Sequence, residues 1–491
     1  MRRAATTVAL LLALALAMVA TRSSAAPVTA SSLRTPAHAT LSLHPKNPRY
    51  VRFRGRPTLL ITSGEHYGAV VIPDFDFATY LRQLAAHRFN LTRVFSGSYV
   101  ETPEFIRGRM YGNPLAPAPG RLLAPWARSP SPGYANGGAR FDLARWNPAY
   151  FARLKSFVRA AGQHGIVVEL VLFSAYYTEE NWRFSPLHST NNINGVGAVP
   201  IEQVFDLERG DSRLLAVQEA LARKLVRELQ AFDNVYLEVV NEPYHVPCSV
   251  GTVCPVLRWQ EHITSVIVDE QRRVGRKHLI AHNVANGAAR VVAPNRHVSI
   301  FNFHYALPET VTMNADLRRP IADDETGFKG DAPFPYRQEA WRFVFAGGTI
   351  VSNLDWSFAP RHERGTLSTR GFWAGGGGPA LRRQLSILRR FVESFPLLRL
   401  TPAPEIATAS PDGTAVDVLA DPGRAYAVYL SGATPKNVRL RLPAGRYRAT
   451  WTSTRTGSAI RRVTFRTTGR ATLGVPGYRE DVAIDLRRVQ P

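Results

Sequence analysis

Cysteine is almost absent from this chain: only Cys248 and Cys254 occur among its 491 residues. A zinc site needs about four ligands, and His245 is the one further candidate close to the two cysteines, so we expect no metal ion and no cofactor. In an oxidising compartment, two cysteines separated by five residues favour a disulfide over a metal pair. The sequence therefore predicts one short loop closed by a disulfide.

Long apolar runs are also lacking beyond the N-terminus, which excludes a transmembrane helix. Arg2 and Arg3 precede an apolar run from residue 8 to residue 20, and small residues follow up to Ala26. This order of charged, apolar and small segments is typical of a secretory signal peptide, predicted over residues 1–26. The thirteen apolar residues are too few to span a bilayer, so we expect a secreted protein.

Acidic residues are scarce relative to basic ones, at 38 against 61, and the formal net charge is +23. The arginines are spread along the whole length, and neither a basic stripe nor a nucleic-acid recognition module occurs, so we expect no nucleic-acid partner. A basic surface favours acidic polymers or an anionic cell wall through general electrostatics. Codon usage biased toward arginine gives the same composition without such a partner, and we favour that explanation.

The pattern of apolar runs predicts a parallel α/β architecture over residues 45–400, where strand-like runs alternate with helix-like stretches. Asn147 and Pro148 begin one helix, which ends at Gly165, and leucines between residues 214 and 229 form the apolar stripe of another. Helices should therefore cover both faces of the sheet. Eight strands are predicted, at residues 58–63, 91–96, 166–173, 235–240, 278–283, 299–305, 320–324 and 349–355.

Two predicted connections are unusually long, at residues 99–145 and 174–203. Loops of this length in a compact domain are usually functional or disordered. Both follow C-terminal ends of strands, so they should overhang the active face. Tyr176, Tyr177 and Trp182 in the second loop either offer rings for a sugar to stack on or simply pin the loop down.

The pattern changes near residue 401. Short alternating runs follow at 414–419, 425–430, 438–442 and 447–453, separated by Asp-Gly, Pro-Gly and Ser-Gly turns. They predict a small antiparallel β-sandwich without a cluster of titratable residues. About 465 residues follow the signal peptide, more than one core usually organises. We therefore expect a linker at 27–44, a catalytic domain at 45–400 and an accessory domain at 401–491.

The tripeptide Asn241-Glu242-Pro243 follows the apolar run 235–240, which is typical of a strand buried on both faces. Proline ends that strand. If the sheet closes into a (β/α)8 barrel, the C-terminal strand ends form the active face and Glu242 is catalytic. The alternative is that Glu242 caps the next helix.

Further motifs lie at the ends of other predicted strands. They are Arg93 on the second strand, Phe303-His304-Tyr305 on the sixth, residues 323–327 on the seventh and Asp355-Trp356 on the eighth. With Asn241-Glu242-Pro243 on the fourth strand, these motifs make residues 45–400 resemble the glycoside hydrolases of clan A, retaining (β/α)8 enzymes that include cellulase-like families. The C-terminal segment, with Ala449-Thr450-Trp451 and Arg455-Thr456-Gly457, resembles the accessory domain that often follows such barrels. The resemblance implies a (β/α)8 TIM barrel followed by a small antiparallel β-sandwich.

The resemblance implies that Glu242 is the acid/base and Glu325 the nucleophile of a retaining mechanism, in which the two carboxyl groups lie about 5–5.5 Å apart. Glu242 should then be protonated at rest and Glu325 ionised. Arg93 and the hydroxyl of Tyr305 would stabilise the Glu325 carboxylate. Asn241 is placed to hydrogen-bond a sugar hydroxyl.

Three further residues are predicted to bind substrate. His66 ends the first strand beside Glu65, which could instead cap a helix. Trp356 is expected to be a sugar platform, because a ring at a strand end would sit on the open face. His304 faces the same region, although a core histidine is the alternative.

Two assignments within the barrel stay open. Arg93 could be a buried structural ion pair and not a partner of the nucleophile. Along the seventh strand, alternation predicts Asp323 and Glu325 on one side and Asp324 on the other. Asp323 would then be a neighbour that tunes Glu325.

We therefore predict a secreted glycoside hydrolase, expected to be a monomer, that acts on a polysaccharide or oligosaccharide. The alternative from another class is a non-catalytic carbohydrate-binding or cell-wall adhesion protein on a barrel scaffold, because fold alone does not imply activity. A serine hydrolase is discounted, because the chain has no Gly-x-Ser-x-Gly elbow followed by suitably placed Asp and His residues.

Overall fold

The computed structural model describes residues 40–105, 110–111, 113–246, 254–370, 375–410 and 413–489. The predicted signal peptide and Cys248, one half of the predicted disulfide, lie outside the described residues, so both remain predictions. None of the described helices combines the length and the apolar character that crossing a membrane requires.

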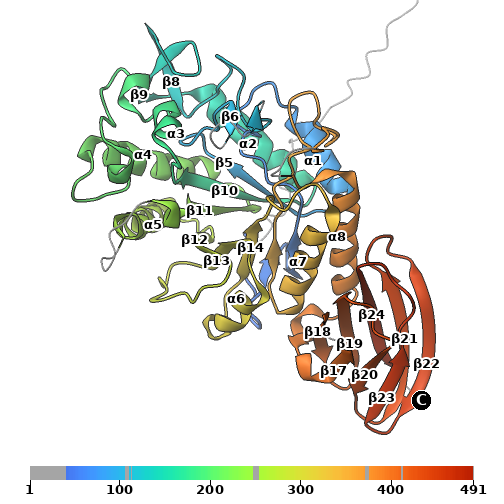
Figure 1. The fold of residues 1–491 in the computed structure, drawn as a ribbon. Coiled ribbons are helices and arrows are strands. Elements are labelled where there is room, and N and C mark those ends of the chain that lie inside the picture. Colours follow the sequence, from blue (N-terminus) through green and yellow to red (C-terminus); the bar gives the residue numbers. More distant parts are fainter. Residues whose placement is uncertain are drawn as a thin grey trace, which may run out of the picture. The chain divides into compact units, whose positions relative to one another are not determined.

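Eight parallel strands form a single sheet that curves into a barrel, which confirms the predicted (β/α)8 fold (Figure 1). The first and last neighbours meet where the His66 amide donates to the Arg93 carbonyl at 3.0 Å and the Arg93 amide donates to the Gly64 carbonyl at 3.2 Å. In their order around the barrel the strands are β4 (Leu60–Ile61), β15 (Ile350–Val351), β14 (Ile321–Glu325), β13 (Ile300–His304), β12 (Ile280–Asn286), β11 (Val235–Asn241), β10 (Val167–Ser174) and β5 (Leu91–Phe95).

Helices surround the outer face of the sheet, as the alternating pattern predicts, but the inner face encloses the side chains of the barrel interior, so the prediction that helices cover both faces is wrong. α2 begins at the predicted cap, where the Asn147 side chain accepts a hydrogen bond from the Ala149 amide at 3.1 Å and Pro148 occupies the first turn. Gly165 follows its end with a positive φ of 71°. The helices are α1 (Phe77–Ala86), α2 (Pro148–Gln163), α3 (Glu179–Phe184), α4 (Ser212–Leu229), α5 (Pro255–Val274), α6 (Pro308–Met313), α7 (Pro333–Phe345) and α8 (Gly378–Glu393).

A small antiparallel sheet, β1 (Ser42–Leu43), β2 (Val51–Phe53) and β3 (Arg56–Thr58), precedes the barrel. Its apolar side chains share a core with the first residues of the barrel strands, including Leu91 and Val167. This sheet therefore covers the N-terminal ends of the strands and leaves the opposite end for the site. Its first strand lies within the stretch predicted as linker.

The two long loops have their own structure. The loop after β5 forms two hairpins, β6 (Glu104–Phe105) with β7 (Met110–Tyr111) and β8 (Trp126–Pro132) with β9 (Ala139–Trp146). In the loop after β10, Tyr176 and Trp182 are buried, and the Trp182 indole donates to the Val199 carbonyl at 2.8 Å. These two rings hold the loop in place, so only Tyr177 of the three predicted aromatics faces the pocket described below.

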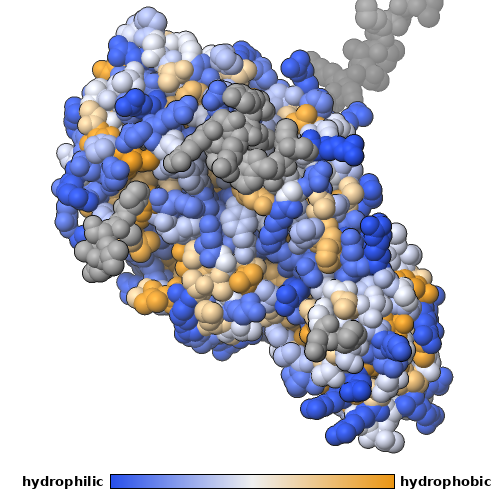
Figure 2. All heavy atoms as spheres, in the orientation of Figure 1, coloured by the Kyte–Doolittle hydropathy of each residue, from blue (hydrophilic) through white to orange (hydrophobic). Residues whose placement is uncertain are grey.

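The C-terminal region consists of antiparallel β-sheets, as predicted. Trp451 and its neighbours form a separate apolar core between the sheets. Figure 2 shows hydrophilic side chains over most of the visible surface, with apolar ones in small separate groups. One sheet contains β16 (Thr401–Pro402), β18 (Thr414–Asp421), β19 (Ala425–Gly432), β24 (Asp481–Val489), β21 (Gly445–Ser453) and β22 (Ala459–Thr467), and the other β17 (Ala407–Ser410), β20 (Asn437–Arg441) and β23 (Arg470–Gly474).

Candidate active site

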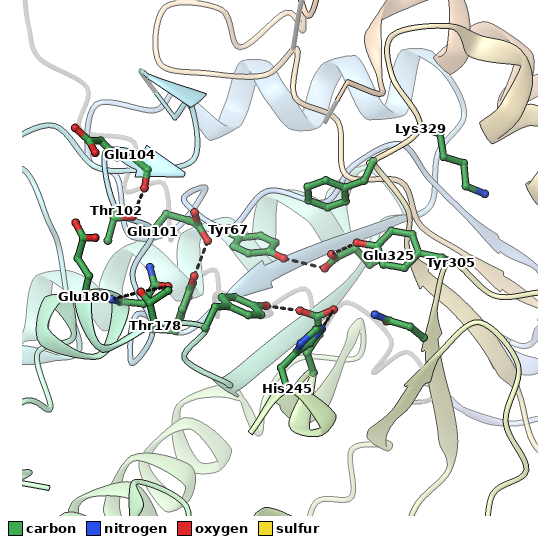
Figure 3. Close-up of a pocket in the computed structure, with 16 residues that line it drawn as sticks. Tyr67, Glu101, Thr102, Glu104, Thr178, Glu180, His245, Tyr305, Glu325 and Lys329 are labelled. Atoms are coloured by element: carbon green, nitrogen blue, oxygen red, sulfur yellow. Dashed lines mark hydrogen bonds and ion pairs between the residues drawn. The ribbon is translucent and has the colours of Figure 1, made fainter. Parts of the chain in front are cut away.

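A pocket of about 560 Å³ opens at the C-terminal ends of the barrel strands, below the two long loops (Figure 3). Glu242, at the end of β11, and Glu325, at the end of β14, both line it. The other end of the pocket carries Glu101, Glu104 and Glu180, which come from the two loops. The pocket therefore brings together the two carboxylates that the sequence predicts to be catalytic.

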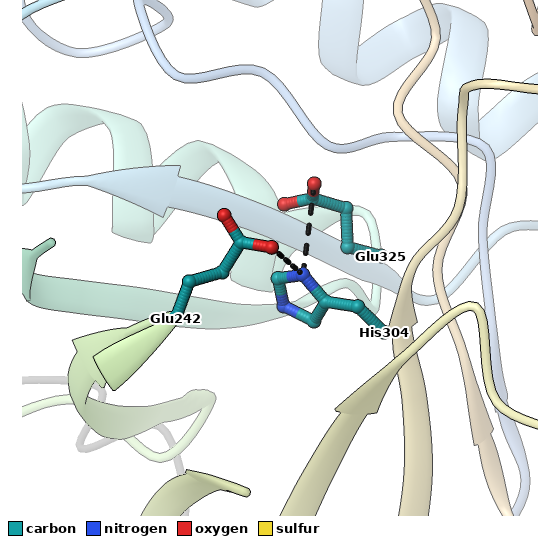
Figure 4. Close-up of side chains that lie close together, drawn as sticks. All are labelled: Glu242, His304 and Glu325. Carbon is teal, nitrogen blue, oxygen red and sulfur yellow. Dashed lines mark hydrogen bonds and ion pairs between the residues drawn. The ribbon is translucent and has the colours of Figure 1, made fainter. Parts of the chain in front are cut away.

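His304 lies between the two glutamates (Figure 4). Its Nδ1 is 3.1 Å from Oε1 of Glu242 and 3.6 Å from Oε1 of Glu325, and its side chain is completely buried. One atom of each of the three side chains lies within 4.8 Å of the others, a spacing that would also admit a metal ion. The expectation that His304 belongs to the site therefore agrees with this geometry.

Two residues of the site have a left-handed backbone. Glu242 has φ 50° and ψ 49°, and Tyr305 has φ 50°. For residues other than glycine this conformation costs of the order of 1–3 kcal/mol, and it persists only where the surrounding structure enforces it. At Glu242 it turns the chain sharply between β11 and Pro243, which aims the carboxylate into the pocket.

Glu325 receives hydrogen bonds from three donors. Nη1 of Arg93 lies 3.0 Å from Oε2, the Tyr67 hydroxyl lies 2.8 Å from the same oxygen, and the Tyr305 hydroxyl lies 3.1 Å from Oε1. Tyr67 and Tyr305 point toward Glu325 in Figure 3. Donors of this kind stabilise the ionised form of a carboxyl group. The arrangement suits an anionic nucleophile.

Arg93 is completely buried and is held by more side chains than Glu325 alone. Glu238 on β11 accepts two hydrogen bonds from its guanidinium, both at 2.9 Å, and the Asn241 side-chain oxygen accepts a third at 2.6 Å. Glu65 forms a further ion pair with Nη1. Arg93 is therefore both the predicted partner of Glu325 and the centre of a buried ion-pair network. The two roles that were predicted as alternatives are both present.

The seventh strand departs from the predicted alternation. In its pairing with β13, Phe303 is opposite Asp323 and His304 is opposite Glu325, so the ladder skips Asp324. This bulge turns Asp324 toward Nε of Arg93, at 3.2 Å, on the same side as Glu325. Asp323 instead accepts from the Ala306 amide at 2.9 Å. The prediction that Asp323 shares a side with Glu325 is wrong because one extra residue shifts the period of two.

Burial of several carboxyl groups around one guanidinium changes their protonation. Burial raises the pKa of Glu65 and of Asp324, although Arg93 acts in the opposite direction on both. Burial and the charge of Glu238 raise the pKa of Glu169, one strand away, to about 8. These shifts favour the neutral forms of the buried carboxyl groups, which limits the negative charge beneath the pocket.

Glu242 is surrounded by side chains that stabilise its charge. Tyr177 donates a hydrogen bond to its Oε2, and the ring nitrogens of His304 and His245 lie 3.1 Å and 3.5 Å from Oε1. Burial acts to raise the pKa of Glu242, but the hydrogen bonds and charges of the two histidines outweigh it and hold the pKa well below its usual range. This direction runs against the predicted protonated Glu242 at rest, which stays a prediction.

Three predicted substrate-binding residues have other surroundings. His66 is completely buried, its ring packs against that of Phe75 in a tilted arrangement with centroids 4.3 Å apart, and burial lowers its pKa to about 4. Trp356 has no exposed surface, and its indole donates to the Gly327 carbonyl at 3.3 Å. Both lie outside the pocket wall and cannot touch a sugar there. Asn241 lies beneath the pocket, where its amide donates to the Tyr177 hydroxyl at 3.1 Å.

Four pocket residues had no predicted role in the chemistry. Tyr67 bonds Glu325, Tyr177 and His245 contact Glu242, and Glu101 accepts from the Tyr99 hydroxyl at 2.8 Å within the loop after β5. Tyr67 and His245 each lie close in the sequence to a predicted site residue, so proximity to a strand end could have identified them. Glu101 has no such signal, because only the path of the loop brings it to the pocket.

No family model and no curated protein sequence matches the chain. Solved structures match over 92% of it: a candidate glycoside hydrolase of Bacteroides vulgatus, at 16% identity, 83% of that chain and a TM-score of 0.64; a family 5 glycoside hydrolase of the same organism, at 12%, 93% and 0.61; and a protein described as a glycoside hydrolase, at 11%, 97% and 0.59. At these identities the similarity concerns the fold, which agrees with the architecture that the resemblance to clan A implies.

Proposed function

We propose that the chain is a glycoside hydrolase that cleaves O-glycosidic bonds in a polysaccharide or oligosaccharide by a retaining double displacement. The observation that carries this proposal is the approach of Glu242 and Glu325 across the pocket, with carboxylate oxygens within 4.8 Å of each other. Retaining enzymes place their carboxyl groups about 5–5.5 Å apart, whereas inverting enzymes need about 6.5–9.5 Å to admit a water. Similar solved structures described as glycoside hydrolases support the proposal.

In the first step Glu325 attacks the anomeric carbon, a glycosyl ester forms, and the bond to the leaving oxygen breaks. Arg93, Tyr67 and Tyr305 hold the carboxylate in place through the three hydrogen bonds described above. Such preorganised donors act where charge changes in the transition state. The leaving oxygen takes its proton from Glu242.

That proton must move to Glu242 before it is transferred. Nδ1 of His304 and Nε2 of His245 both face Oε1 of Glu242, so either ring is placed to pass a proton to it. A sugar in the pocket excludes water, which disfavours the charged forms of the carboxylate and of the imidazoles. The proton then passes to Glu242. In the second step Glu242 takes a proton from water, whose oxygen attacks the anomeric carbon and releases Glu325.

Two further expectations belong to the proposal. Residues 1–26 would direct secretion of the protein. The pocket walls carry Tyr67, Tyr177 and Tyr305, whose rings and hydroxyls suit contacts with sugar hydroxyls.

The proposal is tested with aryl glycosides and a panel of polysaccharides. Glu325→Ala should abolish turnover on every substrate, because no covalent intermediate forms. Glu242→Ala should retain the first half-reaction on a glycoside with an activated leaving group, and added azide should accelerate the second. Proton NMR of the first-formed product should show retained anomeric configuration. Inversion, or near-normal activity of Glu325→Ala, would overturn the mechanism, and binding of glycans without turnover would favour the adhesion alternative.

A further inference from the structure

The C-terminal β region contains a long segment without any acidic residue. From residue 422 to residue 479 the sequence has eleven arginines and one lysine, and neither Asp nor Glu. The whole chain, by contrast, has 38 acidic residues for 61 basic ones. A uniform bias toward arginine explains more basic residues but not the loss of every acidic one over this stretch.

Four arginines of the C-terminal region line one hollow. Its volume is about 770 Å³, and Arg446 on β21, Arg466 on β22, Arg470 on β23 and Arg488 on β24 all contribute to it. The side chains of all four are exposed. The hollow therefore collects positive charge from four strands at one place on the sheets.

The strand pairing sets these charges against one another. Arg446 is directly opposite Arg466 in the β21–β22 ladder, and Arg441 is directly opposite Arg470 in the β20–β23 ladder. Like charges at opposite positions destabilise a sheet. Among the described residues no carboxylate forms an ion pair with the arginines of these two opposite pairs. The repulsion is therefore uncompensated within this part of the chain.

We propose that this hollow binds an anionic polysaccharide through its carboxylate groups. The planar guanidinium of arginine forms two parallel hydrogen bonds with a carboxylate, which lysine cannot do. Arg446, Arg466 and Arg470 have side chains available for such contacts. Arg488 already donates to the Ala444 carbonyl at 2.8 Å, so it contributes charge and also holds the turn before β21.

The choice of a polysaccharide over a nucleic acid rests on the proposed function and on the lack of a stacking surface. Proteins that bind single-stranded nucleic acids combine positive charge with aromatic rings on which bases stack. The exposed large apolar residues of the described C-terminal region include Ile460 but no aromatic ring. A polymer held there would be kept near the barrel, which raises its effective concentration at the pocket.

The test measures binding without turnover, so it is independent of the proposed catalysis. The full chain carrying Glu325→Ala is run through native gels that contain polygalacturonate, neutral mannan or no polymer, and its affinity is measured from the retardation. We expect retardation by polygalacturonate alone, and loss of at least tenfold in affinity when Arg446→Gln, Arg466→Gln and Arg470→Gln are combined. High salt should weaken the binding, because exposed charges are screened.

The matched control variant also loses three positive charges, but in the part of the chain before residue 401. Arg56→Gln, Arg145→Gln and Arg383→Gln remove three exposed arginines and should change the affinity less than twofold. Equal losses in both triple variants would overturn the proposal, because net charge would then explain the binding. Unchanged binding in the hollow variant would also overturn it, as would tighter binding of double-stranded DNA than of polygalacturonate. Thermal unfolding checks that the hollow variant is folded. The midpoint of its unfolding should stay the same or rise, because the substitutions remove a repulsion between arginines.

Discussion

Asp481 on β24 accepts two hydrogen bonds from Arg337 on α7, at 2.6 Å and 2.8 Å, and both side chains are almost completely buried. The pair joins a helix of the barrel to the C-terminal β region. Nearby, the ring of Trp341 stacks on that of Tyr429 with centroids 5.0 Å apart. Removal of the C-terminal region would leave a buried guanidinium without its carboxylate and would expose an indole. Buried contacts therefore join the residues before and after the predicted boundary near residue 401. It remains a prediction that residues 45–400 and 401–491 are separate domains.

Asp481→Ala is expected to lower the free energy of unfolding by about 3 kcal/mol, because it leaves Arg337 buried without its main counterion. Urea denaturation measures the loss. Asp485→Ala removes the more exposed pair with Arg487 and should cost less than about 1 kcal/mol. Similar costs for the two variants would show that burial does not govern the contribution of Asp481.

Tyr177→Phe is expected to reduce kcat about tenfold, because Glu242 loses a hydrogen bond worth about 1 kcal/mol and the Asn241 amide loses one of its two acceptors. Tyr176→Phe is the matched control. Its hydroxyl donates to the Ser98 carbonyl at 3.1 Å, which links the two long loops, and it does not contact Glu242 or Glu325. Steady-state kinetics on an aryl glycoside should show the loss in the first variant only, and equal effects would place the role of Tyr177 in loop structure.

His245→Gln is expected to move the basic limb of the pH–rate profile to higher pH. The charge and hydrogen bond of His245 help to hold the pKa of Glu242 low, so their removal raises that pKa. An acid with a higher pKa loses its proton at higher pH, which extends activity upward. A profile of kcat/KM that starts well below pH 4 and runs to pH 9 measures the limb, and a shift to lower pH would contradict this account.

Glu101 makes the stability of the protein depend on pH. Burial raises its pKa from 4.5 to about 7. The folded state therefore binds this proton more tightly, so the free energy of unfolding falls as pH rises from 4.5 to about 7 and is constant above. The contribution reaches about 3 kcal/mol.

Glu101→Gln removes this dependence and keeps the size of the side chain, but its Nε2 replaces one of the two oxygens that accept from Tyr99 and Asn113, at a cost that does not change with pH. The variant should gain stability relative to the natural protein between pH 5 and pH 8, measured by urea unfolding at both values. Glu180→Gln, at an exposed position on the same pocket, serves as control. A constant difference between Glu101→Gln and the natural protein across this range would refute the assignment.

The sequence predicts the barrel well because its strands are buried on both faces, and such strands are visible in the sequence as short runs of apolar residues. Glu242 and Glu325 are found for the same reason, since each directly follows or ends such a run. The bulge at Asp324 was not predictable, because one skipped residue in a ladder depends on the neighbouring strand. Trp356 was misplaced because a strand end can turn its side chain outward from the axis, and only the packing of the loop after β15 decides that direction.

The left-handed backbone at Glu242 and Tyr305 lowers the stability of the fold, so keeping these two side chains for the proposed function has a cost during evolution. Glycine would relax either position, since it adopts positive φ at little steric cost. Selection for a stable fold alone would therefore replace both residues and erase the Glu242 carboxylate and the Tyr305 hydroxyl, which both line the pocket. A lineage that abandons the chemistry should lose these two side chains early and gain stability, while the apolar barrel around them persists.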